Sequence, residues 1–150
     1  MSYASLAKGR YSEAGQVYFV TTVLADRQAR YFADFQCARL LIGEMRALHD
    51  TGEVDSLAWV VMPDHLHWLF QMQESSSLVR VMKALKAKSA QRVNRLLKRQ
   101  GALWQKAYYD RAVRKDEDLL EIARYIVANP LRAGLVDKLG NYPLWDAVWL

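Results

Sequence analysis

Residues 60–70 read VVMPDHLHWLF, and this stretch decides what kind of sheet the chain can build. Apolar, β-branched and aromatic side chains dominate residues 56–62 and 65–71, a composition that is typical of strands. Pro63 and Asp64 lie between these runs or interrupt them, and both residue types are common in turns. We therefore predict two strands in this part of the chain.

Two of the three histidines, His65 and His67, lie in the second of these strands with one residue between them. Successive side chains of a strand point to opposite faces, so the run divides into two sets. One face would carry His65, His67 and Leu69. The other face would carry Leu66, Trp68 and Phe70, which have the character of a core.

Two strand rises separate the imidazoles by roughly 7 Å at their roots, so their rings can lean together onto one metal ion. Two histidines would leave coordination positions open, as a catalytic metal requires. The spacing alone fits hydrogen-bonded histidines on a half-exposed strand equally well.

The rest of the chain predicts strands and helices around this pair. Asp34 and Ser77 are capping residues that precede runs with helical apolar spacing. Acidic residues at 116–118 suit the positive end of a helix dipole, and Pro130 would close that helix. The expected elements are a strand over 16–25, a helix over 34–50, the two strands above, a helix from 77, an extended segment over 103–113 and a helix over 116–129. This order predicts one α+β domain over residues 1–150, a ferredoxin-like antiparallel sheet with helices packed on one face.

The composition excludes several classes of protein. The chain has 150 residues and is 52% hydrophobic, enough for a core. No apolar run approaches the roughly 18 residues that span a bilayer, and residues 1–15 lack the apolar centre of a signal peptide. Cys37 is the single cysteine, which excludes an internal disulfide, and we expect it to be a small buried hydrophobe. We expect a soluble cytoplasmic protein that has no membrane partner.

One long segment carries positive charge without negative charge. The net charge is +5, the isoelectric point is about 9.4, and no Asp or Glu occurs between Ser75 and Tyr109. A solvated helix face usually mixes charges of both signs, so this segment favours a phosphate-rich partner over a merely solvated face. Its basic residues are Arg80, Lys83, Lys86, Lys88, Arg92, Arg95, Lys98, Arg99 and Lys106.

The predicted helix over 116–129 carries a possible nucleophile and a possible ligand. Tyr125 and Asn129 are four residues apart and therefore lie on the same side of the helix. An amide oxygen suits Mg²⁺ or Mn²⁺, and a phenol can act as a covalent nucleophile. A packing tyrosine and a helix-ending asparagine explain the same residues, and only the histidine pair singles them out.

Four stretches, in this order, resemble one known family. They are VVMPDHLHWLF (60–70), LKAKSAQRVN (85–94), GALWQKAYYDRAVR (101–114) and YIVANPLRAGLV (125–136). Together they resemble the REP-associated tyrosine transposases, which belong to the HUH single-tyrosine transposases. The resemblance runs from about residue 10 to the end of the sequence. It does not extend to the DNA-recognition and regulatory roles that longer relatives give to their tails, because the sequence ends with YPLWDAVWL.

The resemblance implies a site and a chemistry. His65 and His67 match the metal ligands of the family, Tyr125 matches its nucleophile, and Asn129 matches the polar residue that completes the metal site. Tyr108 and Tyr109 are competing nucleophiles of lower rank. The implied cofactor is Mg²⁺ or Mn²⁺, and the implied product is a 5′-phosphotyrosine. The implied substrate is single-stranded or hairpin DNA of the repetitive extragenic palindrome type, bound by a nucleoid-associated monomer or homodimer.

The basic segment and its aromatic residues supply candidate DNA contacts. Phosphates would be bound by Lys83, Lys86, Arg92 and Arg95. Bases would stack on Trp104, Tyr108 and Tyr109, although core packing explains Trp104 equally well.

Two other functions fit the same residues. A ferredoxin-like sheet with a basic helix can bind single strands without catalysis. A metal-dependent phosphodiesterase would use water instead of tyrosine. That function is disfavoured because carboxylates are scarce near the histidine pair, and we expect Asp64 to point to the opposite strand face.

Overall fold

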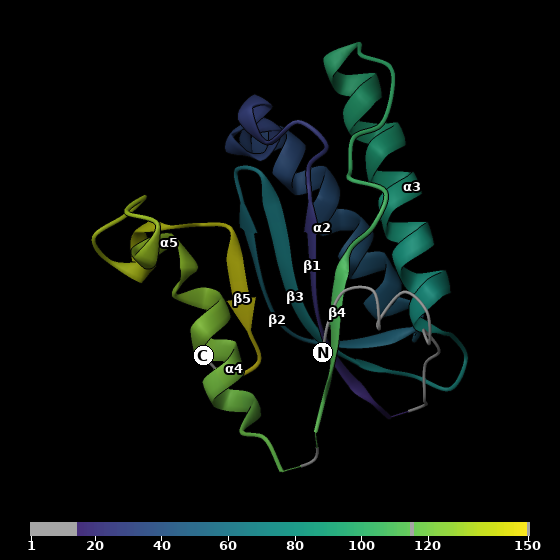
Figure 1. The fold of residues 1–150 in the computed structure, drawn as a ribbon, viewed down its shortest axis with the longest axis vertical. Helices are drawn as coiled ribbons and strands as arrows, with labels where there is room; N and C mark the ends of the chain where they lie inside the picture. The colour runs from purple at the N-terminus through teal and green to yellow at the C-terminus, as the bar shows by residue number, and fades with distance from the viewer. Residues whose placement is uncertain (1–14, 115, 150) are drawn as a thin grey trace.

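The structure is a computed structural model that describes residues 15–114 and 116–149; the segment expected to lack a signal peptide lies almost entirely outside these residues. Within them, five strands form one antiparallel sheet in the order β4-β1-β3-β2-β5 (Figure 1). The strands are β1 (Val17–Val23), β2 (Val54–Met62), β3 (His65–Met72), β4 (Tyr109–Val113) and β5 (Trp145–Ala147). The helices are α2 (Phe35–Asp50), α3 (Leu78–Leu97), α4 (Leu119–Val127) and α5 (Asn129–Arg132), with short 3-10 turns at Arg27–Ala29, Tyr31–Ala33 and Leu139–Asn141. The α+β antiparallel fold class is confirmed.

The two long helices begin where their capping residues predict. The Asp34 carboxylate accepts a hydrogen bond from the Gln36 N–H, and the Ser77 hydroxyl accepts one from the Arg80 N–H. Both helices pack on one face of the sheet, against the buried side chains of Leu66, Trp68 and Phe70. The predicted core face of β3 is confirmed.

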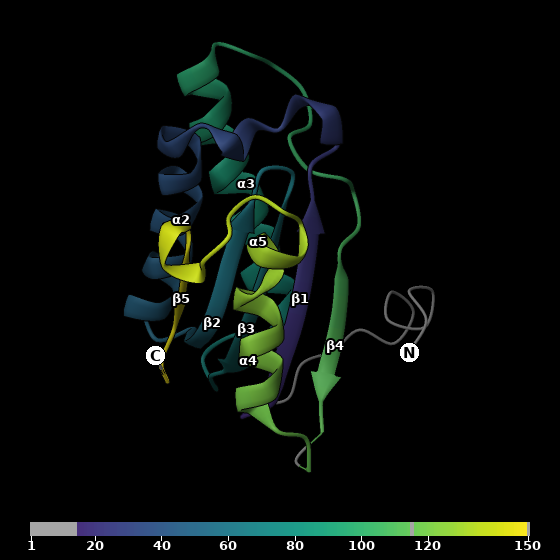
Figure 2. The same ribbon diagram turned by 90° about the vertical axis from the view of Figure 1, so that its left-hand side faces the viewer.

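The placement of the last long helix corrects the expectation that the helices share one face. Ala123, Ile126 and Val127 of α4 pack in a second apolar cluster with Val60 and Leu69. These sheet residues lie on the face opposite to the one that α2 and α3 cover, and Figures 1 and 2 show α4 across the sheet from those two helices. Apolar side chains lie on both faces of this sheet, so α2 and α3 alone would leave one apolar face exposed to water. Helix α4 covers part of that second face.

The end of α4 also differs from the prediction. The helix stops at Val127, and Pro130 does not close it but lies in the first turn of α5. Proline is well tolerated there, because the first turn of a helix leaves its N–H groups without partners. Strand β5, which pairs with β2 through Ala58, Trp59 and Val60, was not predicted because it has only three residues.

The extended segment before β4 is mostly not strand. Only Tyr109–Val113 joins the sheet, apart from an isolated bridge between Leu24 and Trp104. No helix in the described part of the chain is long and apolar enough to cross a membrane.

Candidate active site

The two strand histidines stand together on the sheet face that α4 covers. The ring centroids of His65 and His67 are 4.7 Å apart, and the rings meet edge to face at 74°. The side chain of His65 is 16% exposed, and His67 is half-buried. The strand alternation thus brings both imidazoles together, as predicted.

Each histidine is held through the same ring nitrogen. The Nδ1 of His65 lies 2.7 Å from the Asp64 carboxylate, and the Nδ1 of His67 lies 2.7 Å from the Thr21 hydroxyl. Thr21 is the direct cross-strand partner of His67. When Nδ1–H donates to these oxygens, Nε2 of each ring keeps its lone pair for a metal ion. Such partners of metal-binding histidines fix the tautomer and the orientation of the ring.

The position of Asp64 corrects the sequence-based expectation. Asp64 lies in the turn between β2 and β3 rather than in a strand, so strand alternation does not fix its direction. Its carboxylate points to His65 and also accepts a 2.8 Å hydrogen bond from the Arg27 Nε–H. Burial favours a higher pKa for Asp64, but the hydrogen bonds from His65 and Arg27 outweigh it and hold the pKa below its usual value.

Electrostatics keep His67 neutral. Burial, followed by the charges of His65 and Arg132, lowers the pKa of His67 to about 3, and Asp64 opposes this only in part. A neutral imidazole is the form that binds a metal ion.

The elements that carry the other two candidate residues lie over the same face. Helix α4 contacts β2 and β3, and α5 contacts β2. Tyr125 on α4 is 56% exposed, and Asn129 is half-buried at the start of α5. The guanidinium carbon of Arg132 lies 4.0 Å from the centre of the Tyr125 ring. The structure therefore places the tyrosine, the asparagine and the histidine pair on one side of the sheet.

The candidate ligands fit a hard divalent ion whose remaining coordination positions would be filled by a substrate. Within the described residues, no group of three or more His, Cys, Asp or Glu side chains could hold a metal. Two imidazoles and an amide oxygen would leave positions open for phosphate oxygens and water, which Mg²⁺ and Mn²⁺ accept readily.

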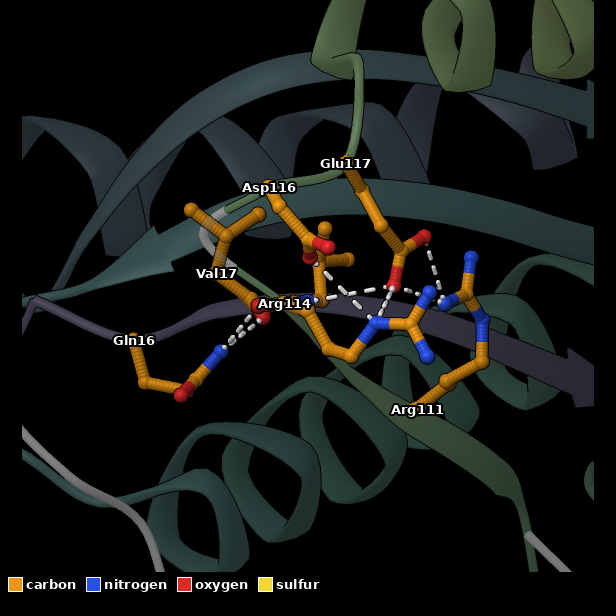
Figure 3. Close-up of polar contacts among 7 residues, drawn as sticks. Gln16, Val17, Arg111, Arg114, Asp116 and Glu117 are labelled. Carbon is orange, nitrogen blue, oxygen red and sulfur yellow. Dashed lines mark hydrogen bonds and ion pairs between the residues drawn. The ribbon is translucent and has the colours of Figure 1, made fainter.

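A polar tether fixes the start of α4 over this face. Figure 3 shows Glu117, just before α4, paired with Arg111 of β4 and with Arg114. Both carboxylate oxygens of Glu117 lie 2.8 Å from Nη1 of Arg111. Together with Tyr125, Arg111 and Glu117 also line a hollow of about 390 Å³ between the helix and the sheet.

The predicted base-stacking residues divide into buried and exposed ones. Trp104 is 5% exposed, and its indole N–H donates to the Ser89 hydroxyl; Tyr108 is 8% exposed and lies under the Lys86 ammonium. Their burial corrects the expectation that both rings are free to stack on bases. Tyr109 is 54% exposed and is the cross-strand partner of Thr21 in β1. Because Thr21 is also the partner of His67, Tyr109 lies on the histidine face.

The predicted phosphate contacts lie mainly on the other side of the sheet, on α3. Lys83 and Arg95 are exposed, and Arg92 is exposed beside Glu44 with a 3.7 Å ion pair. The Lys86 ammonium instead donates to the carbonyl oxygens of Gln105 and Lys106 at 2.7 and 3.0 Å. Lys86 therefore ties the segment before β4 to α3, and its role is at least partly structural.

Four contacts of the site could not be found by sequence reasoning. Thr21 and Asp64 contact the histidine rings, Arg27 holds the Asp64 carboxylate, and Arg132 covers the tyrosine. Cross-strand register reveals Thr21 only after β1 is aligned with β3. Arg132 is the arginine of the YIVANPLRAG stretch, but no spacing rule connects it to Tyr125.

The fold is that of the tyrosine transposases of the HUH type. Residues 17–129 match the family described as "Transposase IS200 like", and the chain belongs to that family. This is a class of enzymes, and its members are generally metal-dependent.

The most informative relatives sharpen this assignment. A protein assigned as a REP-associated tyrosine transposase in Haemophilus influenzae is 29% identical over 143 residues, which cover 86% of this chain and 78% of the relative. The REP-associated tyrosine transposase of Escherichia coli K12 is 25% identical over 139 residues, 89% of this chain and 78% of the relative. The resemblance to REP-associated tyrosine transposases is therefore confirmed.

Two solved structures share the fold. The structure of a REP-associated tyrosine transposase bound to a REP hairpin covers 91% of this chain and 79% of that chain, with a TM-score of 0.77 and 22% identity. A protein from Deinococcus radiodurans assigned as a transposase covers 79% of this chain and 94% of its own, with a TM-score of 0.55 and 24% identity.

Proposed function

We propose that the protein is a metal-dependent single-strand DNA endonuclease and strand transferase that acts through Tyr125. One observation carries this proposal: an exposed tyrosine on α4 lies over the sheet face where His65 and His67 have their Nδ1 atoms held and their Nε2 atoms available. A relative of the same fold is bound to a REP hairpin, which supports hairpin-forming palindromic DNA as the substrate class.

His65, His67 and Asn129 would hold the divalent ion, Mg²⁺ or Mn²⁺. When bound, the ion acts as a Lewis acid on a phosphate oxygen. The Asp64 carboxylate, which can only accept, keeps the His65 ring in the ligand tautomer, and the Thr21 hydroxyl stops the His67 ring from turning away. The low pKa of His67 keeps this ligand unprotonated throughout the physiological range.

Tyr125 supplies the nucleophile. Its phenol oxygen forms a bond to phosphorus in line with the 3′ oxygen, and the bond between phosphorus and that oxygen breaks. The phenol loses its proton and the departing 3′ oxygen gains one, so the step consumes neither water nor a cofactor. The product is a 5′-phosphotyrosine and a free 3′-hydroxyl. A 3′-hydroxyl of another strand can reverse the step, which makes the reaction a strand transfer.

The placement of the site suits an unpaired strand. Tyr109 offers an exposed ring at the β4 edge, in the same cross-strand row as Thr21 and His67. Bases stack on such rings only after they have left a duplex. The exposed bases of a hairpin flank meet this requirement, and exposed Lys83 and Arg95 on α3 remain candidates for phosphates further along the DNA.

The test uses hairpin DNA with single-stranded flanks, incubated with Mn²⁺ or Mg²⁺ and separated on a denaturing gel. A label at the 3′ end follows the fragment that joins tyrosine, and a label at the 5′ end follows the fragment with the free hydroxyl. We expect a protein–DNA band with wild type and with Tyr109→Phe, and none with Tyr125→Phe or His65→Ala.

Three other outcomes would each contradict the proposal. A band that persists in Tyr125→Phe and disappears in Tyr109→Phe would move the nucleophile to β4. Cleavage without a covalent band would identify a hydrolase that uses water. Binding without cleavage, across several hairpins and both metals, would leave a single-strand binding module.

A further inference from the structure

Arg132 makes two contacts with the proposed nucleophile. Its guanidinium carbon lies 4.0 Å from the centre of the Tyr125 ring, and its Nη1 donates a 2.7 Å hydrogen bond to the carbonyl oxygen of Tyr125. The two positions are seven apart in the sequence, and the break between α4 and α5 at Ala128 brings the arginine back over the tyrosine. The stacked guanidinium limits the directions that the phenol can take.

Arg132 also lies on the metal-binding side of the site. It is the last residue of α5, the short helix that begins with Asn129 and contacts β2, the strand paired with the histidine strand. The guanidinium is therefore in contact with the proposed nucleophile and on the same short helix as a candidate metal ligand. A scissile phosphate has to lie within reach of both groups.

Unlike two other arginines near the site, Arg132 has no carboxylate partner among the residues that the structure describes. Arg27 is paired with Asp64, and Arg111 is paired with Glu117. Arg132 forms no ion pair with any residue in 15–114 or 116–149, and its side chain is exposed. An uncompensated cation beside a nucleophile favours an anionic ligand.

We propose that Arg132 binds the scissile phosphate and presents it to Tyr125. This inference rests on the proposed role of Tyr125. One N–H of the guanidinium is used by the Tyr125 carbonyl, and the planar group has further donors for non-bridging phosphate oxygens. As the phenol oxygen attacks, negative charge grows on these oxygens, and a fixed cation stabilises the transition state more than the ground state.

A purely structural role is the competing explanation, because the bond to the Tyr125 carbonyl also caps the C-terminus of α4. Arg132→Gln separates the two roles, since glutamine retains an amide donor but has no charge. Arg124→Gln is the matched control: it removes the same charge from an exposed arginine of α4, adjacent to Tyr125.

The experiment measures two quantities on DNA of one sequence. The first is the rate of covalent complex formation, followed on denaturing gels. The second is the dissociation constant for DNA, measured by fluorescence anisotropy with Tyr125→Phe protein, which leaves the DNA intact. The DNA is used either unmodified or with one methylphosphonate, which removes the charge of the scissile phosphate only.

We expect Arg132→Gln to slow covalent complex formation by about 100-fold, the usual effect of losing one charge-stabilising donor. In the Tyr125→Phe background we expect it to weaken binding of unmodified DNA by about tenfold and to leave binding of the methylphosphonate DNA nearly unchanged. Arg124→Gln should produce neither effect. Thermal unfolding of the variants should match wild type.

The outcomes separate this inference from the function on which it rests. If wild type forms no covalent complex, the role of Tyr125 is wrong. If wild type forms the complex and Arg132→Gln matches Arg124→Gln, only the role of Arg132 is wrong. Equal weakening on unmodified and methylphosphonate DNA would likewise overturn phosphate binding and leave a structural cap.

Discussion

The two faces of the sheet are built from alternate residues of the same strands, yet they have opposite characters. On the face under α2 and α3, the side chains of Leu66, Trp68 and Phe70 are completely buried. On the face under α4, His65 and His67 remain partly accessible between those residues. The first face is covered by helices of 16 and 20 residues, and the second by a helix of nine.

This difference shows how one strand serves stability and chemistry at once. Each large apolar side chain on the face under α2 and α3 contributes about 1.5–3 kcal/mol to the free energy of unfolding, because folding removes it from water. The histidines contribute little in that way, and their neighbours hold them through hydrogen bonds. Because the side-chain period of a strand is two residues, a change at one position reaches one face and largely spares the other.

The largest expected effect tests this separation directly. We expect Trp68→Ala to lower the free energy of unfolding by about 3–5 kcal/mol, because it leaves a cavity and removes the hydrogen bond to Ser56. We expect His65→Ala, three residues earlier, to cost only about 1 kcal/mol while abolishing the covalent complex. Urea unfolding measures the stability of both variants. Similar losses of stability would mean that the two faces do not divide these roles.

A smaller effect is expected from the residues that orient the histidines. Asp64→Asn and Thr21→Val should weaken Mn²⁺ binding by about 10–100-fold while the sheet stays intact, because the imidazoles lose their fixed orientation. Isothermal titration calorimetry measures this affinity without any cleavage. Thr22→Val, on the opposite face of β1, is the matched control and should bind Mn²⁺ as wild type does. Equal affinities in all four proteins would remove Asp64 and Thr21 from the site.

The smallest effect concerns the tether that holds α4 over the second face. Hydrogen bonds from Arg111, and then from the backbone of Arg114, lower the pKa of Glu117 below its usual value of 4.5. A carboxyl whose pKa is lower in the folded protein stabilises the fold above its unfolded pKa, and this contribution disappears as the pH falls through the folded pKa. We therefore expect Glu117→Gln to be less stable than wild type at neutral pH and to converge with it in acid. Urea unfolding over a pH series tests this, and a difference that stays constant down to roughly pH 3 would contradict it.

Much of the fold could be predicted because its signals are local. Alternation in VVMPDHLHWLF places the two histidines together, and Asp34 and Ser77 start their helices as capping residues do. The side of the sheet that α4 covers could not be predicted. An amphipathic helix identifies its own buried residues but not the surface that buries them.

The same limit explains the errors and omissions at the site. Trp104 lies in a segment without regular structure, where no periodicity distinguishes a buried ring from an exposed one. Asp64 belongs to a turn, so the strand rule that fixes His65 does not apply to it. Thr21 and Arg132 reach their partners through strand register and through a break between helices, and both depend on the assembled fold.

The junction of α4 and α5 has a consequence for how the site can be switched. Ala128 alone separates the two helices, so Tyr125, Asn129 and Arg132 all belong to one short continuous unit. This unit is secured by the apolar side chains of α4 and by the Glu117 tether, whereas the histidines are fixed in the central strand of the sheet. Lifting α4 would therefore withdraw the proposed nucleophile, the proposed amide ligand and the Arg132 cation together. The histidine half would be left in place, and the activity would respond to docking of a single helix as a unit.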